Sequence, residues 1–69
     1  PAREKALRQL LEAEDRYADA LLAQSSAIIG LLKAPGTQLA MMRMQRAARQ
    51  VDASGAAFDL AHEDYERTK

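Results

Sequence analysis

Three side chains of the types that bind metal ions lie at spacings that a helical bundle could bring together. Asp59 and His62 are three residues apart, like the acid and the imidazole of the Glu-x-x-His pattern in di-metal four-helix bundles. Glu14 would face them if the chain folds back on itself. The chain has one His and no Cys, and Asp is shorter than the Glu of that pattern. A structural hydrogen bond is therefore the favoured interpretation; no metal or other cofactor is expected, and a metal-binding bundle is the lesser alternative.

No other arrangement of reactive side chains indicates catalysis. Ser25 and Ser26 are far along the chain from His62, and Ser54 is about two helical turns from it. The glycines are isolated, so there is no Gly-rich loop of the kind that holds phosphates. We therefore predict that the protein is not an enzyme.

Four basic residues fall in a stretch of the chain without acids, residues 21–51, which we name the turn half. They are Lys33, Arg43, Arg46 and Arg49. The favoured interpretation of such a segment is a solvated cationic face over a Met-filled core. As a functional signal it suggests docking of an acidic protein partner, and the alternative is an adaptor that binds nucleic acid or an anionic membrane through these four residues. Because the formal net charge is zero and no aromatic residues alternate with the arginines, protein is the favoured partner, ahead of nucleic acid and of membrane.

Two long helices are predicted on either side of one break. Good helix formers dominate, whereas the β-branched and aromatic residues of strands are scarce. Pro35 and Gly36 interrupt the pattern, and Thr37 is a suitable N-cap for a second helix. We predict an all-α antiparallel hairpin as a single domain over 1–69, with helices over about 2–33 and 38–67 and a turn at 34–37.

Both arms carry a heptad repeat, which predicts coiled-coil packing with positions a and d in the seam. On the first arm these positions are Leu7, Leu10, Glu14, Tyr17, Leu21, Gln24, Ile28 and Leu31. On the second arm they are Met41, Met44, Ala48, Val51, Gly55, Phe58, His62 and Tyr65. Antiparallel folding pairs residues whose numbers sum to 72, so the bulky Tyr17 should meet Gly55.

Position g is small on both arms. Its residues are Ala6, Ala13, Ala20, Ala27, Ala40, Ala47, Ser54 and Ala61. An edge of such residues allows a close approach between helices, and it could seat either the partner arm or a second hairpin. The turn half also contains Met41, Met42 and Met44, and Met side chains adapt to irregular partners.

The first arm is apolar beyond one seam, at Leu11, Ala18 and Leu32 in position e and at Leu22 and Ile29 in position b. A lone hairpin cannot cover these residues, so we predict a homodimer or larger homo-oligomer that forms a four-helix bundle. Two chains that open at the turn and exchange arms are an alternative. The predicted interface is Leu11, Ala13, Ala20, Leu22, Ala27, Ile29, Leu32, Met42, Ala47, Ser54 and Ala61.

The expected function is that of a protein–protein interaction or assembly module. In architecture the predicted hairpin is similar to plasmid copy-control hairpins and to small hairpin subunits of secretion systems, which implies a small bacterial-type regulatory or assembly protein. No stretch approaches the roughly 20 apolar residues of a membrane span, and no signal-peptide pattern is seen. We therefore expect a soluble, cytoplasmic protein.

Overall fold

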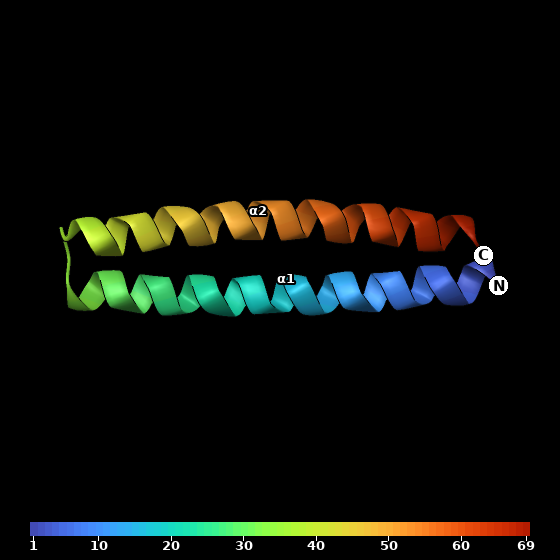
Figure 1. Cartoon of the computed structure of the whole chain (residues 1–69), viewed down its shortest axis with the longest axis horizontal. Helices are drawn as coiled ribbons and strands as arrows, with labels where there is room; N and C mark the ends of the chain where they lie inside the picture. The colour runs from blue at the N-terminus through green and yellow to red at the C-terminus, as the bar shows by residue number, and fades with distance from the viewer.

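The computed structural model describes all residues from 1 to 69 as two antiparallel helices (Figure 1). Helix α1 spans Ala2–Lys33 and helix α2 spans Gln38–Arg67. No strand is present, so the predicted all-α hairpin is confirmed. The molecule is a rod whose Cα atoms extend over 50 × 13 × 12 Å, and both termini lie at the end opposite the turn (Figure 1).

The turn is built by the predicted break and by a hydrogen-bonded cap. Pro35 cannot supply the backbone N–H that a continuing helix needs, and Gly36 has a φ of +81°, which few other residues adopt. The Thr37 hydroxyl donates to the Ala34 carbonyl oxygen at 3.1 Å and accepts from the Ala40 N–H at 3.2 Å. One side chain therefore caps α2 and ties its start to the residue that ends α1.

The two helices pack through heptad positions g and d, so the predicted seam is confirmed for position d and wrong for position a of α1. Position a of α2 is half-buried at Ala48 and Gly55. The buried residues of the chain are all alanines at position g: Ala6, Ala13, Ala20, Ala40 and Ala47. The residues at d are half-buried, whereas Leu7, Leu21 and Ile28 at position a of α1 are 40–42% exposed. Small side chains at g let the two backbones approach closely, and this approach turns position a of α1 to the flank of the seam.

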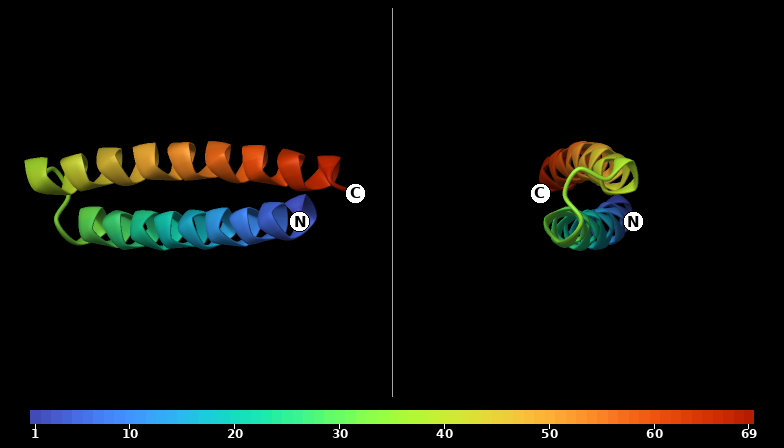
Figure 2. Two further views of the ribbon diagram at one scale, coloured as in Figure 1. Left: turned by 45° about the vertical axis from the view of Figure 1, so that its right-hand side comes forward. Right: turned by 90° about the vertical axis from the view of Figure 1, so that its left-hand side faces the viewer.

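The predicted register is present where Tyr17 meets Gly55. A Cβ atom placed on Gly55 would lie 3.3 Å from Tyr17 Cε1. The Tyr17 ring stacks on Phe58 of α2, with ring centroids 5.9 Å apart and an interplanar angle of 24°. Two aromatic rings from opposite helices thus use the space that the missing side chain leaves open. Figure 2 shows the helices side by side along their whole length and slightly crossed when viewed end-on.

Candidate interaction surfaces

One side of α1 carries large apolar side chains that the chain itself does not cover. These exposed residues are Leu7, Leu11, Leu21, Leu22, Ile28, Ile29 and Leu32. They occupy heptad positions a, b and e, which fall within an arc of about 100° because each residue turns the helix by about 100°. Leu22 is 68% exposed and Leu32 is 75% exposed. The surplus apolar surface that the sequence predicts is therefore present.

The same surface continues onto α2 near the turn. Met41 and Met42 are exposed at positions a and b of α2. In an antiparallel pair, matching heptad positions lie on the same side of the seam, so Met41 lies beside position a of α1, and Met42 follows it on the outer surface of α2. We name the seven α1 residues, together with Met41 and Met42, the apolar face.

The small residues predicted for an intermolecular interface lie instead between the helices of one chain. Three of them are buried, namely Ala13, Ala20 and Ala47, and three are half-buried, namely Ala27, Ser54 and Ala61. Of the two roles left open for position g, seating the partner arm is the one seen here. The other predicted interface residues are exposed: Leu11, Leu22, Ile29, Leu32 and Met42.

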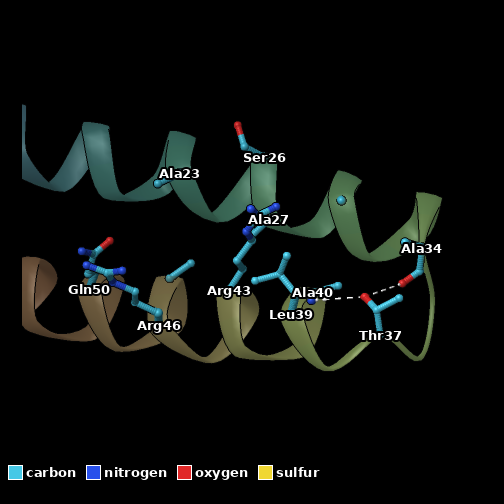
Figure 3. Close-up of a pocket in the computed structure, with 12 residues that line it drawn as sticks. Ala23, Ser26, Ala27, Ala34, Thr37, Leu39, Ala40, Arg43, Arg46 and Gln50 are labelled. Carbon is cyan, nitrogen blue, oxygen red and sulfur yellow. Dashed lines mark hydrogen bonds between the residues drawn. The ribbon is translucent and has the colours of Figure 1, made fainter.

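A groove of about 830 Å³ runs between the helices near the turn (Figure 3). Most of its lining residues occupy positions c, f and g, so it lies on the flank of the seam opposite the apolar face. Helix α1 contributes the small residues Ala23, Ser26, Ala27 and Gly30, and α2 contributes Leu39, Ala40, Arg43, Arg46, Ala47 and Gln50. In Figure 3 the Arg43 side chain extends from α2 toward Ala27 of α1.

The four basic residues of the turn half form no ion pairs. Every ion pair in the chain lies within residues 62–69, at the open end of the hairpin. Arg43 and Arg46 line the groove, and Arg49 lies beside them on a neighbouring part of the α2 surface. Lys33 is in the last turn of α1 and does not line the groove. The structure thus groups the three arginines and separates them from Lys33.

The residues considered for metal binding do not come together within the hairpin. The His62 ring lies beside Phe58, with centroids 6.3 Å apart, and its Nε2 atom is 3.5 Å from Glu66 Oε1. No group of three or more His, Cys, Asp or Glu side chains is arranged to hold a metal ion. Glu14 is exposed on α1.

The groove is the feature that sequence reasoning missed. Its signal was the run of small residues at Ala23, Ala27 and Gly30, spaced three and four apart on one side of α1. This spacing marks a low ridge on a helix. The sequence does not show that this ridge would lie across from Arg43 and Arg46, because that depends on which heptad positions pack between the helices.

Neither helix is long and apolar enough to cross a membrane. Comparison with protein-family models, with curated proteins and with solved structures finds no match. The apolar face and the arginine-lined groove are therefore the observations that bear on function.

Proposed function

We propose that the chain is a self-associating interaction module that buries the apolar face against a second copy, so that two hairpins form a four-helix bundle. The observation that carries this proposal is the contrast between seven exposed large apolar residues on one side of α1 and a core of five alanines. A continuous apolar surface of this kind is typical of an interface. Burying one Leu or Ile side chain contributes about 1.5–3 kcal/mol.

A lone hairpin gains little from its own core, which supports association. Each buried residue is an Ala, and Ala has far less apolar area to remove from water than Leu. The chain has no cysteine that could reinforce the fold by a disulfide. Two-helix units of this kind usually need a further source of stability, and pairing supplies one.

Sedimentation equilibrium on matched double variants tests the proposal. Leu11→Gln with Leu32→Gln removes two residues of the apolar face, whereas Leu39→Gln with Leu60→Gln removes two similarly exposed leucines at position f of α2. We expect a dimer for the natural chain and for the α2 variant. We expect the Kd to rise at least about tenfold for the α1 variant, since each lost Leu contributes about 1.5–3 kcal/mol. A monomeric natural chain across the micromolar range would contradict the proposal.

A second candidate function is the docking of an acidic protein segment in the groove. The specific observation is that Arg43 and Arg46 line an open groove and make no ion pair. Arginine donates paired hydrogen bonds to carboxylates. The groove and the apolar face lie on opposite flanks of the seam, so both can be occupied at once.

Fluorescence anisotropy with a labelled polyglutamate peptide tests this second candidate. We expect binding that weakens with salt and is lost when Arg43, Arg46 and Arg49 are all changed to Gln. The matched control changes Arg3, Arg8 and Arg16, which lie in the N-terminal half of α1. Equal loss in both triple variants, or no binding at low salt, would exclude the groove. RNA and anionic vesicles serve as competing probes, and tighter binding to either would favour the adaptor alternative.

A further inference from the structure

We infer that two copies pair antiparallel through α1, with the turn of each hairpin beside the open end of the other and the two-fold axis crossing near Asp19 and Ala20. This inference rests on the proposed self-association and specifies its geometry. The exposed residues of α1 and the charges along the rod together favour one orientation.

Positions a and e of α1 form a heptad seam of their own. Their residues alternate at steps of four and three along the helix: Leu7, Leu11, Glu14, Ala18, Leu21, Ser25, Ile28 and Leu32. The centre of this stripe lies about 100° around the helix from the g and d seam, at about 100° per residue. Helix α1 can therefore contact α2 on one side and a second hairpin on another, as in a four-helix bundle.

An antiparallel pairing of two such stripes places apolar residues opposite apolar residues and polar residues opposite polar residues. Position a of one copy lies opposite position e of the other: Leu7 with Leu32, Leu11 with Ile28, Glu14 with Ser25 and Ala18 with Leu21. Each large apolar residue of the stripe then faces another apolar residue. The only acid of the stripe faces a small hydroxyl side chain and stays at a polar layer.

A parallel pairing of the same stripe brings like charges together. Glu14 would face Glu14 of the second copy. Such contacts between carboxylates destabilise helix pairs. The basic turn halves of both copies would also lie side by side. The stripe therefore discriminates against the parallel orientation.

The distribution of charge along the rod favours the antiparallel orientation as well. The turn half has four basic residues and no acid, whereas the rest of the chain has six basic and ten acidic residues. In the antiparallel dimer each basic half lies beside an acidic half. This attraction acts over about 10 Å at 0.1 M salt, so it steers orientation most strongly when ionic strength is low.

Electron–electron distance measurement on spin-labelled chains tests the orientation. The chain has no native cysteine, so Lys33→Cys gives a single label near the turn, at position f and away from both seams. In the antiparallel dimer the labels of two copies are separated by 27 residues, or about 40 Å at 1.5 Å per residue. A separation of about 25 Å or less would overturn the inference, because it places the two turns together.

Asp19→Cys, which places the label at position f near the inferred axis, is the matched control. Its two labels should lie within about 25 Å of each other in either orientation. A short distance from both variants means that copies pair through α1 in the wrong orientation, so only the inference fails. If neither variant shows dipolar coupling, self-association itself fails.

A charge exchange provides a second test without a label. Ser25→Lys places a cation opposite Glu14 of the second copy only in the antiparallel dimer, whereas Ser25→Glu places an anion there. We expect Ser25→Lys to bind itself severalfold more tightly than Ser25→Glu, and Glu14→Lys combined with Ser25→Glu to restore affinity. Equal weakening by Lys and by Glu at position 25 would overturn the inference, because a parallel pair sets residue 25 against itself.

Discussion

At the scale of single residues, the three glycines occupy three different environments. A Cβ atom on Gly30 would meet nothing within 4 Å, whereas one on Gly55 would lie 3.3 Å from the Tyr17 ring. Gly36 has open space around it but a φ of +81°. Changing each glycine to the same residue therefore distinguishes three effects on stability: helix propensity at Gly30, side-chain contact at Gly55 and backbone conformation at Gly36.

Alanine substitutions should change stability in opposite directions at two of these sites. Gly30→Ala should raise the free energy of unfolding by about 1 kcal/mol, because Ala is the better helix former. Gly36→Ala should lower it by about 1–2 kcal/mol, because an L-residue is strained at this φ. Urea denaturation at one fixed protein concentration measures both. A smaller gain is expected for Gly55→Ala than for Gly30→Ala, and an equal gain would show that the Tyr17 ring is not in contact.

At the scale of the helices, the seven-residue repeat of the packing could be predicted from the sequence, but not which two heptad positions form the seam. The a and d pair and the g and d pair both repeat every seven residues and share position d. Leu7, Leu21 and Ile28 made position a the more apolar choice. The structure places alanines in the centre instead, because closeness of the two backbones depends on the smallest side chains and not on the most apolar ones.

Enlarging one of the central alanines should separate the helices. Ala20→Leu should lower the free energy of unfolding by about 1–3 kcal/mol, because the extra atoms find no room in a close-packed seam. Ala53→Leu, at an exposed position f of α2, should change it by less than about 0.5 kcal/mol. Chemical denaturation followed by circular dichroism measures both. Tolerance of Leu at position 20 would instead support the a and d seam.

At the scale of the whole molecule, the exposed apolar face was predictable and the groove was not. Leu22, Ile29 and Leu32 widen the apolar stripe of α1 beyond what one partner helix can cover, and this holds whichever heptad positions form the seam. The groove depends on how closely the helices approach and on where Arg43 extends, and both depend on the seam. The turn was predictable because Pro35 and Gly36 act through backbone chemistry alone.

Thermal stability should depend on protein concentration if the apolar face is buried by a second copy. Association stabilises the folded state by mass action, so the Tm should rise as concentration rises. The variant with Leu11→Gln and Leu32→Gln should unfold at a lower Tm that varies less over the same range. Calorimetry across a hundredfold range of concentration measures this. A Tm of the natural chain that is independent of concentration would argue against pairing.

The position of both chain ends, at the pole of the rod away from the turn (Figure 1), determines how a reporter would be presented. A fluorescent protein or an affinity handle attached at either end would leave the arginines of the turn half unobstructed. In an antiparallel dimer, handles on the two copies would project from opposite poles. Anchoring one handle to a sensor surface would then direct the second copy's handle away from that surface, toward the solution.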